Sequence, residues 1–258
     1  MNASLQTLLD ASNGFLEQGF YVLLRVGPIV GFMPAIGERV VPARVKLVLA
    51  LCFVVAVLPV VGIEVRNSAS SAGFVPAVVL ETTVGLFLGL SLRFLVIILQ
   101  TAGSMAAQAT SLAQLFAGSA AEPMPAIGHF LVISGLAFAM IMGLPLRVLE
   151  MIVTSYDIFP MANGLNLGLL VEWGSTLVAK CFALAFTLAA PFLVMSLLYN
   201  LTLGVINRAM PQLMVAFVGA PVITAGGLAF LFLFSTVMVS IWWQSVEQFL
   251  IRPELFAP

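Results

Sequence analysis

The segment that decides the fold is residues 74–100, FVPAVVLETTVGLFLGLSLRFLVIILQ. It is long enough to cross a hydrocarbon layer of about 30 Å, which needs roughly 20 helical residues. It nevertheless carries two opposite charges, Glu81 and Arg93, and a charge facing lipid costs at least about 2.5 kcal/mol. The segment therefore predicts a membrane-class helix that faces protein or water along one side.

That side of the helix is defined by Glu81, Gly85, Gly89 and Arg93, which recur every four residues. Two glycines four residues apart allow another helix to approach closely. Glu81 and Arg93 are about 18 Å apart along the axis, too far to pair with each other, so each needs a partner elsewhere. The glycine face indicates either packing within one helical bundle or docking against other subunits.

The composition of the whole chain is that of a membrane protein. Hydrophobic residues make up 62% and charged residues 8% of it, whereas soluble domains have about 25% charged residues. The net charge of −1 gives no basic field for nucleic acid. Besides residues 74–100, apolar stretches of about membrane length lie at about 15–36, 45–63, 126–153, 176–206 and 214–243. All six are predicted to be helical, because lipid cannot hydrogen-bond a free backbone.

Prolines and charges interrupt these stretches. An interior proline removes a backbone hydrogen bond and bends a helix. The prolines inside or at the margins are Pro28, Pro34, Pro59, Pro76, Pro145, Pro191 and Pro221. We therefore expect an all-α, polytopic protein built of helical hairpins with proline-broken apolar helices. The charged loop at residues 37–46 is expected on the cytoplasmic side by the positive-inside rule.

Catalytic chemistry has little support in the residues. His129 is the chain's one histidine, and no metal-ligand spacing or nucleophile motif accompanies it. We predict no enzymatic activity, no cofactor and no metal site. Cys52 and Cys181 lie in apolar stretches and are expected to be small interior residues. Secondary transport of a small solute is an alternative, because transporters use broken helices and buried charges; a membrane scaffold without a pore is a third interpretation.

A charge-free run from residue 94 to 121 changes character at Gln108. From there the sequence reads QATSLAQLFAGSAA, in which only Leu112, Leu115 and Phe116 are large and apolar. A solvated loop would carry charge, and a lipid-facing helix would carry aliphatic bulk. This composition predicts a protein-lined or water-lined interior.

The stretch 190–221, APFLVMSLLYNLTLGVINRAMPQLMVAFVGAP, resembles the FliR family of flagellar biosynthetic proteins and its SctT relatives in type III secretion export gates. Upstream residues fit the family's pattern in the same order, so the resemblance covers nearly the whole chain. Departures are Met214, where many relatives carry asparagine, and Glu122, where they often carry aspartate. The upstream residues are Arg25, Pro28, Pro34, Pro42, Arg44, Glu81, Gly85 and Gly89.

The resemblance implies a subunit of the flagellar protein export gate, in the bacterial inner membrane at the basal body. Implied partners are FliP-like and FliQ-like gate subunits in a hetero-oligomeric helical assembly, other export-apparatus membrane components, unfolded export substrates and membrane lipid. It further implies a FliP-like part at residues 1–165, with a plug loop at about 101–125, and a FliQ-like helical hairpin at 166–258. The flagellar system is preferred here to an injectisome.

The resemblance also assigns roles to residues. Glycine and small residues lower the cost of moving a plug aside, and large apolar side chains can occlude water; the alternative is a re-entrant loop merely anchored to the bundle. The pore plug or gate comprises Gln108, Leu112, Gln114, Leu115, Phe116, Gly118, Glu122 and Pro123. Helix packing or subunit contact is implied for Glu81, Gly85, Gly89, Arg93, Asn207, Arg208, Pro211 and Gln212. Arg208 alternatively serves only to end its helix, by complementing the helix dipole.

Overall fold

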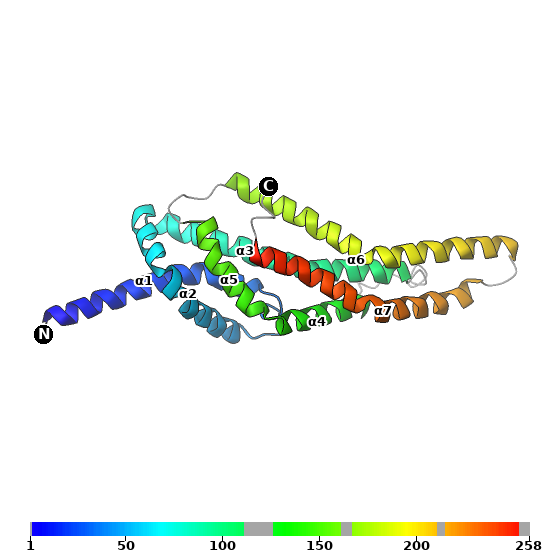
Figure 1. Cartoon of the computed structure of the whole chain (residues 1–258), viewed down its shortest axis with the longest axis horizontal. Helices are drawn as coiled ribbons and strands as arrows, with labels where there is room; N and C mark the ends of the chain where they lie inside the picture. The colour runs from blue at the N-terminus through cyan, green and yellow to red at the C-terminus, as the bar shows by residue number, and fades with distance from the viewer. Residues whose placement is uncertain (1, 111–125, 161–166, 211–214, 253–258) are drawn as a thin grey trace. The chain divides into compact units, whose positions relative to one another are not determined.

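The computed structural model describes residues 2–110, 126–160, 167–210 and 215–252, and all regular secondary structure in these ranges is helical (Figure 1). This confirms the predicted all-α class. The helices are α1 (Asn2–Phe32), α2 (Ala43–Ala72), α3 (Phe74–Thr110), α4 (Ala126–Ile141), α5 (Leu144–Ile158), α6 (Leu167–Ala209) and α7 (Val215–Ile251).

Four helical segments in the described ranges are long and apolar enough to cross a membrane: Ala43–Gly62, Phe74–Ala109, Gly168–Ala209 and Val222–Ile251. The pair α4 and α5 would supply a fifth, broken span. The first apolar stretch forms α1 but is not among these segments, because Glu17, Arg25 and its glycines lower the hydropathy of that helix.

The apolar stretch predicted at residues 126–153 is helical but divided at Gly143 into the separate helices α4 and α5. Gly143 has a φ of 81°, which a residue with a Cβ rarely adopts. Pro145 then stands in the first turn of α5, where its missing N–H costs no helical hydrogen bond. By contrast, Pro28, Pro59 and Pro191 lie inside α1, α2 and α6, which continue past them.

The helices contribute to two compact units. The first unit comprises Met1–Phe94, Met140–Leu177 and Glu247–Pro258, and the second comprises Leu95–Ala139 and Val178–Val246. In the first unit α1 packs against α2. Its core includes Val26 and Ile29 of α1 and Val84 and Leu88 of α3, all of which are fully buried.

The second unit is packed through glycines and aromatic rings. The buried Trp242 of α7 donates its indole N–H to the carbonyl of Leu95 on α3, at 2.7 Å. Gly135 of α4 leaves the space that Leu99 and the Trp242 ring fill. Towards the end of α3 and the start of α4, the two backbones meet where Gly103 lies against Gly128. These contacts bring α3, α4 and α7 together within this unit.

The cysteine prediction is half right. Cys181 is buried as expected, whereas Cys52 is exposed. Cys52 lies on the face of α2 that also exposes Leu51 and Val55, so apolar sequence alone did not distinguish the buried from the exposed side of this helix.

The close approach of α1 to α3 depends on the two glycines of the predicted face. A Cβ on Gly89 would lie 2.8 Å from the carbonyl oxygen of Pro28, and one on Gly85 would overlap the backbone of Arg25. The space beside both glycines is therefore filled by the chain's own α1. This contact favours packing within the chain over subunit docking at these two positions.

We expect Gly85→Ala to destabilise the protein, because the added methyl would force the α1 backbone away from α3. Overpacking of this kind costs typically 1–3 kcal/mol, which thermal unfolding of the purified protein in detergent measures. The matched control is Gly27→Ala on α1, where an added Cβ meets nothing within 4 Å. Equal unfolding temperatures for the two variants would contradict the close crossing.

Candidate functional site

The most unusual site in the first unit is a charge pair with no exposure to solvent. Arg25 of α1 and Glu81 of α3 both have 0% exposed side chains. The guanidinium donates two parallel hydrogen bonds to the carboxylate, from Nε to Oε2 at 2.7 Å and from Nη2 to Oε1 at 2.6 Å. The prediction that Glu81 needs a partner outside its own helix is therefore confirmed.

The C-terminal end of α5 completes the coordination of this arginine. Arg25 Nη1 donates to the hydroxyl of Ser155 at 3.1 Å, and Nη2 donates to the carbonyl of Phe159 at 2.9 Å. The guanidinium carbon also lies 3.7 Å from the centre of the Tyr156 ring, in the range of a cation–π contact. We call Arg25, Glu81, Ser155, Tyr156 and the Phe159 carbonyl the Arg25 cluster.

Aromatic rings hold the segment that supplies this carbonyl. The ring of Phe159 stacks on Trp173 of α6, with centroids 5.4 Å apart and an interplanar angle of 19°. Phe87 of α3 packs edge-on against both rings, at 5.3 Å from Trp173 and 6.4 Å from Phe159. The start of α6 thereby supports the position of the Phe159 carbonyl.

Arg93, at the other end of the α3 face, also has its own partner. It forms an ion pair with Glu38, which lies in the turn after α1, and both side chains are about one-third exposed. The expectation that Arg93 pairs outside its own helix is thus confirmed. The face from Glu81 to Arg93 is contacted along its length by α1 and by the residues that follow α1.

The Arg25 cluster is suited to holding helices rather than to catalysis. Ser155 donates its own proton to the carbonyl of Ile152 at 2.6 Å, and the carboxylate of Glu81 is occupied by arginine. Within the described ranges, no three His, Cys, Asp or Glu side chains group so as to hold a metal ion. His129 is exposed at the start of α4.

The other predicted site residues fall into two groups. Gln108 is exposed near the end of α3, and Asn207 and Arg208 are exposed in the last turn of α6, where Arg208 complements the helix dipole. The remainder lie outside the described residues: Leu112, Gln114, Leu115, Phe116, Gly118, Glu122, Pro123, Pro211 and Gln212.

Sequence reasoning overlooked most of the Arg25 cluster. Arg25 fits the family pattern, but no sequence pattern links it to Glu81, Ser155 or Tyr156. One signal was available: Glu81 needs a positive partner, and Arg25 lies in another apolar stretch. This signal did not show whether Arg25 or another basic residue near an apolar stretch is the partner of Glu81.

The exposed side of the helices complements this buried polarity. Large aliphatic and aromatic side chains are exposed along α2, α6 and α7, with Phe232 reaching 84% exposure. A soluble monomer rarely exposes such extended apolar surface. The fold and the site together define a multi-pass helical membrane protein with a buried charge cluster.

Comparison with known proteins identifies the family. The profile of the family described as "Bacterial export proteins, family 1" matches residues 16–249. The flagellar biosynthetic protein FliR of Caulobacter vibrioides is 34% identical over 226 residues, which cover 86% of this chain and 89% of that protein. The chain belongs to the FliR family, and this membership indicates a role in flagellar export.

More distant relatives match over a similar length. FliR of Aquifex aeolicus is 29% identical over 82% of this chain and 84% of its own length. FliR of Escherichia coli is 25% identical over 87% of each chain. The likeness therefore extends through both compact units.

We expect Glu81→Gln to be strongly destabilising, since it leaves the Arg25 guanidinium buried without a counter-charge. Breaking a buried pair from one side costs about 3–5 kcal/mol, readable as a lower unfolding temperature in detergent. The double variant Arg25→Met/Glu81→Met removes both charges and should recover much of the loss.

The matched control is Arg147→Gln, which removes two partly exposed pairs, with Glu247 at 3.1 Å and with Glu150 at 3.7 Å. Exposed pairs contribute about 0.2–1 kcal/mol, so its effect should be small. Effects of the same size for Glu81→Gln and Arg147→Gln would show that the Arg25 cluster does not hold the helices.

Proposed function

We propose that this chain is a subunit of the flagellar protein export gate and forms part of its protein-conducting channel together with FliP-like and FliQ-like subunits. The observation that carries the proposal is the match to FliR proteins over more than four-fifths of both chains. The chain would have no chemistry of its own, so the energy for export would come from other components.

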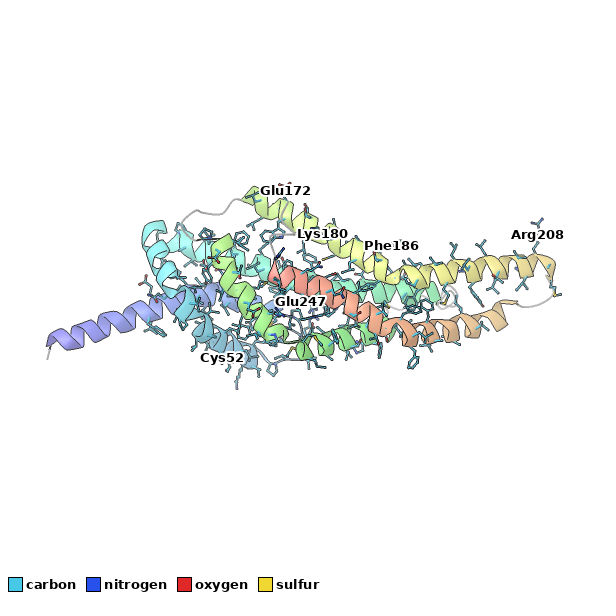
Figure 2. The ribbon with its side chains drawn as sticks, viewed as in Figure 1. Cys52, Glu172, Lys180, Phe186, Arg208 and Glu247 are labelled. Carbon is cyan, nitrogen blue, oxygen red and sulfur yellow. The ribbon has the colours of Figure 1, made fainter. Side chains whose placement is uncertain are left out.

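The surface of α6 and α7 supports an assembly role. In the membrane-length segments of α6 and α7, only 33% and 28% of the most apolar part is buried within the chain, compared with 56% in α3. Glu172 is exposed on α6 (Figure 2). A charge facing lipid is costly, so this position is expected to face partner subunits or water.

The proposed plug is the segment from Gln108 to Pro123, which is free of charge up to Ala121. In the second unit, α3 and α4 approach to backbone contact where Gly103 meets Gly128. The helices that lead into and out of the segment are therefore held close together at its base. A segment with such a base can move aside without separating its flanking helices, which is what a plug requires.

The plug predicts a leak phenotype. Deleting residues 112–120 should raise ion conductance through the assembled gate, because the large apolar side chains that exclude water are lost. The triple variant Leu112→Ser/Leu115→Ser/Phe116→Ser should leak as well, whereas Ala113→Ser should not. After assembly has been verified by size and subunit content, unchanged conductance in the deletion variant would refute the plug.

The assembly itself predicts partners. A tagged chain purified from its native bacterium in mild detergent should retain FliP-like and FliQ-like proteins, detectable by mass spectrometry. A tagged, unrelated multi-pass protein is the control. If the chain purifies alone and moves a small solute across liposome membranes unaided, it is a secondary transporter and not a gate subunit.

A further inference from the structure

The turn after α1 and the first turn of α2 carry two arginines, one each, whose charges are not compensated within the described part of the chain. Glu38, the nearby acid, is engaged by Arg93, and Lys46 Nζ donates to the carbonyl of Gly37 at 2.8 Å. Arg39 and Arg44 are exposed. Neither has a side-chain hydrogen bond or ion pair among the described residues. We call residues 38–46 the basic turn.

The basic turn also presents an apolar side chain to the outside. Val40 is 92% exposed and stands between the two arginines in sequence. The start of α2 exposes Val45, Leu47, Val48 and Leu51. From Arg44 to Leu51 the helix advances about 10 Å, so exposed basic groups give way to exposed aliphatic groups within a short depth.

This order of groups distinguishes between possible occupants. A lipid surface presents anionic headgroups first and acyl chains a few ångströms deeper, which is the order along the start of α2. The segment Ala43–Gly62 is itself of membrane-spanning length and composition. An acidic protein surface would match the arginines but would not explain the row of exposed aliphatic residues that begins beside them on α2.

We propose that the basic turn binds anionic phospholipid headgroups. Arg39 and Arg44 contact the phosphates, Val40 inserts at the boundary between headgroups and acyl chains, and the aliphatic residues of α2 lie in the acyl layer. Long arginine side chains can hold their charge at the interface while their stems follow apolar surface. The engagement of Glu38 by Arg93 keeps the local field positive. This assignment does not depend on the export role.

The test uses the purified full-length chain in nanodiscs made from mixtures of phosphatidylcholine and phosphatidylglycerol. Lipids retained after extraction are counted by native mass spectrometry. Each basic residue near an anionic surface contributes a factor of about five. Arg39→Gln/Arg44→Gln should therefore lower the preference for phosphatidylglycerol by about 25-fold. The wild-type preference should also weaken with salt.

The matched control is Arg208→Gln/Arg252→Gln, which removes the same charge from the exposed ends of α6 and α7. It should keep most of the preference. An equal loss in both double variants would overturn the proposal, because it would indicate only a general effect of net charge. Unchanged lipid preference together with loss of a co-purifying acidic subunit from Arg39→Gln/Arg44→Gln would also overturn it, in favour of a protein contact.

A second measurement remains valid if the double variant fails to fold. Val40→Cys is labelled with an environment-sensitive fluorophore after Cys52→Ala and Cys181→Ala have removed the native thiols. Brominated phosphatidylcholine in the nanodisc should quench the label, as it should quench the same label at Leu51. A label at position 40 that is quenched only by aqueous iodide would place the basic turn away from lipid and overturn the proposal.

Discussion

The ion pair between Arg25 and Glu81 is the constraint on which the first unit depends. Two opposite charges without solvent contact are tolerable only if nearly every donor and acceptor finds a partner. The bidentate geometry satisfies the carboxylate. Ser155 and the Phe159 carbonyl at the end of α5 accept two of the three remaining guanidinium N–H groups. One buried arginine thus determines the relative positions of α1, α3 and α5.

The glycines of α3 are a consequence of this pair. Gly85 lies against the backbone of Arg25 itself, and Gly89 lies one turn further along, against Pro28. With side chains at these positions, α1 would stand further from α3, and the short hydrogen bonds to Glu81 would lengthen. One face of α3 therefore carries, at intervals of four residues, a charge at Glu81, two glycines that allow α1 to approach closely, and a second charge at Arg93.

The sequence predicts much of this arrangement: it shows which residues need a partner, but not which residues those partners are. Helical class followed from hydropathy, and the need of Glu81 and Arg93 for external partners followed from distance along an α-helix. The identity of those partners did not follow, because pairing Arg25 with Glu81 and Glu38 with Arg93 is decided by tertiary packing. Pro145 indicated an interruption of the fourth stretch, but the exact position of the break did not follow from hydropathy, which continues through it. The break is set by the positive φ of Gly143, and α4 and α5 meet there at a bend of 72°.

The two units use different means to hold apolar helices together. In the first unit, charge pairs on α3 specify which helix lies where, since each charge accepts few partners. In the second, Trp242 donates to the Leu95 carbonyl while Gly135, Gly103 and Gly128 permit close packing. Contacts of glycines with backbone and aromatic rings are less selective than buried ion pairs. Long apolar stretches of α6 and α7 remain exposed, as suits a protein embedded in a membrane.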